Sequence, residues 1–87
     1  MSYKIAIVKK AYKELEALPS KTNAQIVQAI DGLKEEPRPP GCKKLKGEAE
    51  TIWRIRVGDY RILYFIEDTI RIVEIRRVGH RKDIYNR

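Results

Sequence analysis

Residues 53–64, WRIRVGDYRILY, have the pattern of two short strands joined by a turn at Gly58-Asp59. If these two residues form the turn, Arg56 lies directly opposite Arg61. Like charges in that position destabilise a sheet by a few tenths to about 1 kcal/mol. A guanidinium stays charged at any working pH and binds phosphate oxygens bidentately. The pattern therefore favours a phosphate-binding face, to which Arg54 also belongs, over a merely solvated one.

The last twelve residues add further positive charge near two side chains that could act on a substrate. Four arginines, one lysine and one aspartate give this segment a net charge of +4, and His80 and Tyr85 lie among them. In isolation, each would more often be a solvated or packing residue. A histidine can both accept and donate a proton near neutral pH, so the segment makes His80 a candidate for proton transfer.

The composition indicates one basic domain, spanning residues 1–87. Charged residues make up 36% of the chain and the net charge is +7, which favours a nucleic-acid partner over solubility alone and makes an anionic membrane a weaker alternative. Cys42 and His80 are the only residues of their types, so neither an internal disulfide nor a Cys/His metal site is expected. No signal peptide or membrane-spanning run is recognisable, and we expect a cytoplasmic protein.

The first half of the chain predicts one strand followed by two helices. Residues 3–8 alternate as a strand that should be buried on much of both faces. Residues 9–18 and 20–36 have helical periodicity, and each segment ends before a proline. The two helices should form an antiparallel hairpin that covers one side of a sheet, and residues 37–42 should form a crossing loop.

The second half predicts three antiparallel strands, at residues 51–57, 60–66 and 69–78. The result is an α+β domain of order β-α-α-β-β-β, with the helical hairpin on one face of a mostly antiparallel twisted sheet. A two-residue turn at Glu67-Asp68 would place Arg61 opposite Glu74, which could then neutralise part of the arginine cluster. The same register would place Tyr64 opposite Arg71.

The two faces of the predicted sheet differ in character. The face that receives the helices is expected to carry Trp53, Ile55, Val57, Tyr60, Ile62, Tyr64, Ile66, Val73 and Ile75. The opposite face is expected to carry Arg54, Arg56, Arg61, Leu63, Phe65, Ile70, Ile72, Glu74 and Arg76. Its apolar members, Leu63, Phe65, Ile70 and Ile72, could receive a segment of a partner protein.

Three segments together resemble the RelE toxins of the RelE/ParE superfamily: KKLKG at 43–47, WRIRVGDYRILY at 53–64 and VGHRKDIY at 78–85. The resemblance covers nearly the whole chain and implies a RelE-like fold. It also implies the toxin of a type II toxin-antitoxin system, which cuts messenger RNA in the ribosomal A site by attack of a ribose 2′-hydroxyl and so inhibits translation. No metal and no cofactor are implied. The implied partners are a RelB-like antitoxin, the ribosome and its messenger RNA, and operator DNA contacted through the antitoxin.

The resemblance also assigns residues. Arg61 matches an arginine implicated in phosphate binding and Arg81 one implicated in catalysis, while Tyr85 matches a tyrosine that stacks on or activates the substrate, at a spacing shorter by two residues. The remaining phosphate-binding positions are Arg54, Arg56, Lys44 and Lys46. Arg54 and Arg56 stand where the best-known member has lysines. Because an arginine is a poor proton acceptor, His80, assisted by Tyr85, becomes the candidate for proton transfer.

Two other functions share parts of this pattern. A ParE-like toxin would have the same fold but would inhibit DNA gyrase without cutting RNA, and its relatives generally lack the basic and aromatic set found here. A non-catalytic RNA-binding module would use the same arginines to bind phosphates. Its case is weaker because Trp53 and Tyr60 are expected in the core, which leaves few rings on which bases could stack.

Overall fold

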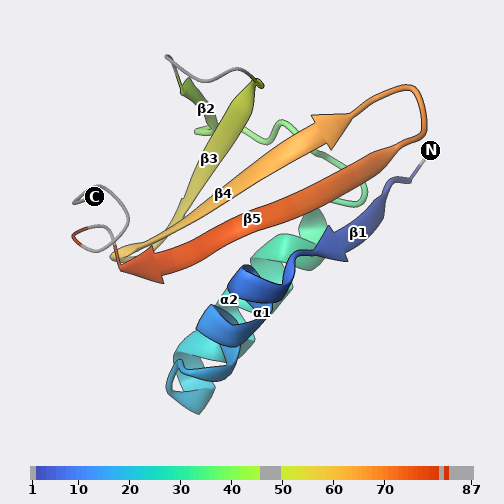
Figure 1. The fold of residues 1–87 in the computed structure, drawn as a ribbon. Coiled ribbons are helices and arrows are strands. Elements are labelled where there is room, and N and C mark those ends of the chain that lie inside the picture. The colour runs from blue at the N-terminus through green and yellow to red at the C-terminus, as the bar shows by residue number, and fades with distance from the viewer. Residues whose placement is uncertain (1, 46–49, 81, 83–87) are drawn as a thin grey trace.

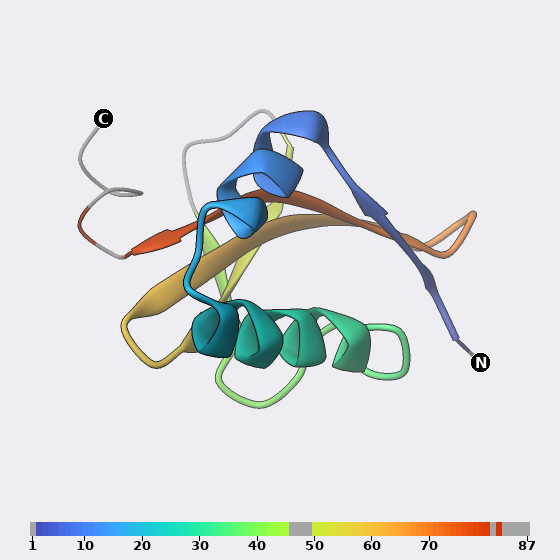
Figure 2. The same ribbon diagram turned by 90° about the horizontal axis from the view of Figure 1, so that it is seen from below.

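The computed structural model describes residues 2–45, 50–80 and 82. In these residues, two helices lie on one face of a five-stranded sheet of order β1-β5-β4-β3-β2 (Figures 1 and 2). β1 runs parallel to β5, and the other neighbours are antiparallel. The elements are β1 (Lys4–Ile7), α1 (Lys9–Glu16), α2 (Ser20–Gly32), β2 (Lys43–Leu45), β3 (Ile52–Val57), β4 (Tyr60–Glu67) and β5 (Ile72–His80). The predicted α+β class is confirmed, with β2 as an additional short strand.

Both helices bury the stripes that their periodicity predicts. Ala11 and Leu15 of α1 are buried, as are Ile26 and Ile30 of α2. α2 ends at Gly32, four residues earlier than predicted, and the chain continues through tighter turns in which Leu33 donates to the Ile30 carbonyl. Neither helix of the described residues has the length and apolarity needed to cross a membrane.

β1 is less buried than the sequence predicts. It forms one edge of the sheet and pairs only with β5, so that Ile7 remains 37% exposed. Only Ile5 of this strand packs against the core, where it is half-buried. The alternation of Tyr3 to Val8 therefore reflects an edge strand that borders the core on one side.

The register of the β3-β4 hairpin is the predicted one. Arg56 pairs with Arg61, and Val57 and Tyr60 flank the turn. Gly58 adopts φ +60°, the left-handed conformation that a glycine accepts at the first position of a two-residue hairpin turn.

The predicted register between β4 and β5 is wrong. The connection runs through residues 68–71 rather than two residues, and Arg71 adopts φ +56° within it. A bulge then shifts the pairing, because Tyr64 lies opposite Ile75 while Leu63 lies opposite Arg77. Arg61 consequently faces Gly79 and not Glu74.

The core lies between the helices and the predicted apolar face of the sheet. Ile55, Ile62, Tyr64, Val73 and Ile75 of that face are buried in it. The Tyr64 hydroxyl donates a buried hydrogen bond of 2.8 Å to the carbonyl oxygen of Pro37, and burial raises the pKa of the Tyr64 phenol. This bond ties the centre of the sheet to the loop that leads into β2.

We predict that Tyr64→Phe lowers the free energy of unfolding by about 1 to 2 kcal/mol, because it leaves the buried Pro37 carbonyl without its donor. Urea unfolding followed by circular dichroism measures the change. Tyr12→Phe is the control, since Tyr12 is 54% exposed, and it should change stability by less than about 0.5 kcal/mol. Equal values for the two variants would contradict the prediction.

Candidate nucleic-acid interface

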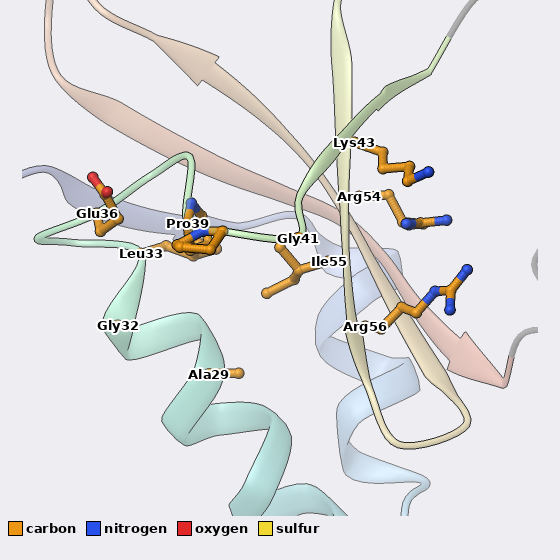
Figure 3. A pocket seen from close by; sticks show the side chains of 11 residues that line it. Ala29, Gly32, Leu33, Glu36, Pro39, Gly41, Lys43, Arg54, Ile55 and Arg56 are labelled. Atoms are coloured by element: carbon orange, nitrogen blue, oxygen red, sulfur yellow. The ribbon is translucent and has the colours of Figure 1, made fainter.

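Arg54, Arg56 and Arg61 form an arginine cluster on the sheet face opposite the helices. Their positions follow from strand alternation: Arg54 and Arg56 are two residues apart on β3, and Arg61 is the partner of Arg56 on β4. Figure 3 shows the side chains of Arg54 and Arg56 extending away from α2, whereas Ile55 between them points towards it. The predicted convergence of these three arginines on one face is therefore confirmed.

Two members of the cluster are buried, although arginine is rarely found in the interior of a protein. Arg54 is 7% exposed and Arg61 is 6% exposed, while Arg56 is exposed. Among the described residues, the buried Nε of Arg54 has no hydrogen-bond partner. Removing a charged group from water costs several kcal/mol unless it is paired. An anionic ligand would offset this cost, which makes the cluster a candidate phosphate site.

Lys43 joins the cluster, which the sequence analysis missed. β2 is antiparallel to β3 and pairs Lys43 with Arg54, so both side chains lie on the same face (Figure 3). Lys44 pairs with Trp53 and so lies on the other face. Recognising KKL as a strand would have distinguished the two lysines by alternation. Lys46, the fourth predicted phosphate-binding position, lies outside the described residues.

Glu74 does not neutralise the arginine cluster; it pairs with Arg76. Arg76 also forms an ion pair of 3.0 Å with Glu50, and these two carboxylates raise its pKa. Its guanidinium lies 5.3 Å from the centre of the Phe65 ring. The charged side chain of Arg76 therefore lies against one member of the apolar patch predicted beside the arginines. Ile70, another predicted member, lies in the 68–71 turn and not on a strand.

His80 lies on the helix side of the sheet, away from the arginine cluster. It pairs with Tyr60, and the two rings meet edge to face with their centres 5.6 Å apart. Both line a groove of ≈ 240 Å³ beside α1, and His80 Nδ1 accepts a 3.3 Å hydrogen bond from the backbone N–H of Lys82. Arg81 and Tyr85 lie outside the described residues, so their predicted roles stay predictions.

Glu14 of α1 holds the end of β5 that leads to His80, a contact that the sequence analysis also missed. Its carboxylate accepts hydrogen bonds of 2.7 Å from the backbone N–H of Val78 and 3.0 Å from Nε of Arg77. β1 pairs with β5 only as far as Ile75, so Glu14 satisfies a backbone donor just beyond the end of that pairing.

Comparison with known proteins decides the family. A family model described as the ParE toxin of type II toxin-antitoxin systems matches residues 5–85. Toxin RelG of Mycobacterium tuberculosis is 39% identical over 88 residues, which cover 100% of both chains. The chain belongs to the RelE toxin family of the RelE/ParE superfamily. Toxin RelE of the same organism is 36% identical over 84 residues, which cover 95% of this RelE-family chain and 86% of that toxin.

Solved structures agree with this assignment. A chain of the RelE-RelB complex from Pyrococcus horikoshii superimposes with a TM-score of 0.81 at 29% identity, covering 93% of this chain and 97% of that one. A chain of the toxin-antitoxin complex RelBE2 from Mycobacterium tuberculosis gives a TM-score of 0.83 at 33% identity, covering 93% and 100%. The predicted RelE-like fold is confirmed.

We predict that Arg54→Met leaves the free energy of unfolding unchanged or raises it by up to about 2 kcal/mol, because methionine keeps the apolar stem and removes the buried charge. Replacing chloride with sulfate at equal ionic strength should stabilise the parent more than this variant. Both effects are measurable by thermal and urea unfolding. Arg56→Met, at an exposed position, is the control for the stability measured in chloride, and it should change the free energy of unfolding by less than about 0.5 kcal/mol. A clear loss of stability in Arg54→Met would contradict the interpretation of Arg54 as a group retained for binding.

Proposed function

We propose that this chain is the toxin of a type II toxin-antitoxin system and acts as an endoribonuclease, needing no metal, that cuts messenger RNA in the ribosomal A site. The observation that carries the proposal is the arginine cluster with two buried members in a chain of the RelE family. The ParE-like alternative acts by binding gyrase and needs no phosphate site, so the arginine cluster favours the nuclease over that alternative.

The proposed reaction is attack of a ribose 2′-hydroxyl on the adjacent phosphate, which releases a 5′-hydroxyl and leaves a 2′,3′-cyclic phosphate. The 2′ proton must be removed, the leaving oxygen must gain a proton, and the crowded phosphorane needs cations beside its equatorial oxygens. Arg56 and Arg61 suit the last task because their fixed donors can meet two oxygens at once. Arg54, assisted by Lys43, would bind a neighbouring phosphate along the same strand of RNA.

The arginines do not suit proton transfer, since a guanidinium retains its proton at any working pH. The position of His80 beside Tyr60 gives no support to the prediction that this histidine is the main proton-transfer group. We propose instead that the Tyr85 phenol accepts the 2′ proton and delivers a proton to the leaving 5′ oxygen, that Arg81 binds the scissile phosphate, and that the ribosome positions the message. Positioning of that kind can supply much of the rate, so free RNA should be a poor substrate.

The partners follow from the same proposal. The structures from Pyrococcus horikoshii and Mycobacterium tuberculosis that resemble this chain are described as RelE-RelB and RelBE2 toxin-antitoxin complexes. This supports a RelB-like antitoxin as the partner of the present chain. The ribosome with its messenger RNA would be the target, and operator DNA would be reached through the antitoxin.

We predict that Arg61→Ala lowers cleavage on programmed ribosomes by about 100-fold or more, because it removes a cation from the transition state. Primer extension on the recovered message measures the cuts. Arg38→Ala is the matched control: Arg38 is paired with Asp68 at 2.8 Å, outside the arginine cluster, and its loss should leave cleavage within about threefold.

Other outcomes of that experiment would overturn the proposal. DNA damage in induced cells without cuts in the message would indicate a gyrase inhibitor. Ribosome binding without cuts by the parent would indicate a non-catalytic RNA-binding module. Efficient cutting of naked single-stranded RNA would contradict the dependence on the ribosome.

We predict that His80→Gln retains cleavage activity within about threefold of the parent, since the His80 ring lies across the sheet from Arg56 and Arg61. Single-turnover rates on programmed ribosomes, compared with those of Arg61→Ala, measure the effect. A loss of about 100-fold or more would return His80 to the role of acid or base.

A further inference from the structure

The last part of β5 has a neighbouring strand on one side only. β1 pairs with β5 as far as Ile75, and β5 continues beyond the end of β1 (Figure 1). Within the described sheet, residues 77–80 pair with β4 alone. On the open side of this segment, the backbone N–H of Val78 donates a 2.7 Å hydrogen bond to the carboxylate of Glu14 in α1. One side chain thus takes the place of a neighbouring strand.

The segment that Glu14 holds lies beside the arginine cluster. Gly79 of β5 lies opposite Arg61 of β4, which in turn lies opposite Arg56 of β3. These three residues form one row across the sheet. The end of β5 is therefore the third strand of the proposed phosphate site, and a shift of its backbone would displace the chain that leads out of this row.

Arg77 makes a second contact around the same edge. It lies opposite Leu63, which pairs with Arg54, so by alternation Arg77 belongs to the arginine face of the sheet. Its Nε nevertheless donates a 3.0 Å hydrogen bond to Glu14 on the helix side. The two side chains are only 20% and 23% exposed. The Arg77 side chain therefore passes around the open edge of β5, and the carboxylate that receives it is partly shielded from water.

We propose that Glu14 is a positioning residue for cleavage, because its bond to the Val78 N–H fixes the backbone from which the chain continues to Arg81. The inference rests on the proposed nuclease, in which Arg81 binds the scissile phosphate three residues after Val78. A hydrogen bond from a backbone N–H to a carboxylate is charge-assisted and stronger than one between neutral groups. Displacement of a catalytic group by about 1 Å can cost about 100-fold in rate. Glu14 would thus affect cleavage from the helix side of the sheet, through the backbone.

The alternative is that Glu14 matters only through its ion pair with Arg77. Two conservative substitutions separate these roles. Glu14→Gln keeps the length of the side chain and an oxygen that accepts from Val78, but it removes the charge that faces Arg77. Glu14→Asp keeps the charge but withdraws the carboxylate by one carbon–carbon bond, about 1.5 Å. A role through Val78 therefore favours the Gln variant, and a role through Arg77 favours the Asp variant.

Single-turnover cleavage over a range of programmed-ribosome concentrations measures the maximal rate and the half-saturating concentration separately. Glu14→Asp should lower the maximal rate at least tenfold with an unchanged half-saturating concentration, and Glu14→Gln should keep the rate within threefold of the parent. Tyr64→Phe is the control for lost stability, since it removes a buried hydrogen bond to Pro37, and it should keep the parent rate. Equal rates for the two Glu14 variants, a larger loss in Glu14→Gln, or a change confined to the half-saturating concentration would overturn the inference.

Amide hydrogen exchange at Val78 tests the contact itself in the absence of RNA. Exchange should be at least tenfold faster in Glu14→Asp than in the parent and within threefold of the parent in Glu14→Gln. An unchanged exchange rate in Glu14→Asp would overturn the inference. A parent that cuts no message would overturn the proposed nuclease, whereas a parent that cuts no faster than Glu14→Asp would overturn the role of Glu14 alone, so the two failures are distinguishable.

Discussion

The pairing of β3 with β4 depends on the turn at Gly58-Asp59, and the rest of the molecule is arranged around that pairing. With Gly58 in the left-handed conformation, Ile55 and Ile62 face the helices while Arg56 and Arg61 face the other way. A slip of one residue would exchange the two sets and place guanidinium groups in the core. The burial of the apolar set therefore fixes where the cations lie.

The arginine face of the sheet is destabilising, and the packing on the helix face compensates for it. Two arginines opposite each other weaken the ladder, and burial of Arg54 and Arg61 adds a desolvation cost. The helix side offsets these effects with a continuous apolar cluster and a buried hydrogen bond from Tyr64 to the loop before β2. Strain retained at one surface and stabilised elsewhere is common at binding sites.

Local chemistry determined which parts could be predicted. The hairpin register followed from a two-residue turn and strict alternation, and the helices followed from their apolar spacing. The β4-β5 register did not follow, because nothing in the local pattern marks Arg71 as left-handed or reveals the bulge that leaves Arg76 unmatched between Ile75 and Arg77. Lys43 was missed because a three-residue strand carries little signal. The contact of Glu14 with Val78, 64 residues along the chain, depends on tertiary packing that no short segment encodes.

The salt dependence of binding to a single-stranded RNA oligonucleotide tests the central claim, that the arginine cluster is one phosphate-binding surface, most directly. Each phosphate contact adds about 0.7 to the slope of log affinity against log salt concentration for single strands. Each of the three substitutions Arg54→Met, Arg56→Met and Arg61→Met should lower the slope by about that amount. Arg76→Met should leave the slope unchanged, because the Arg76 side chain is already paired with Glu50 and Glu74. The reverse result, with the slope kept in all three cluster variants and reduced in Arg76→Met, would contradict the account.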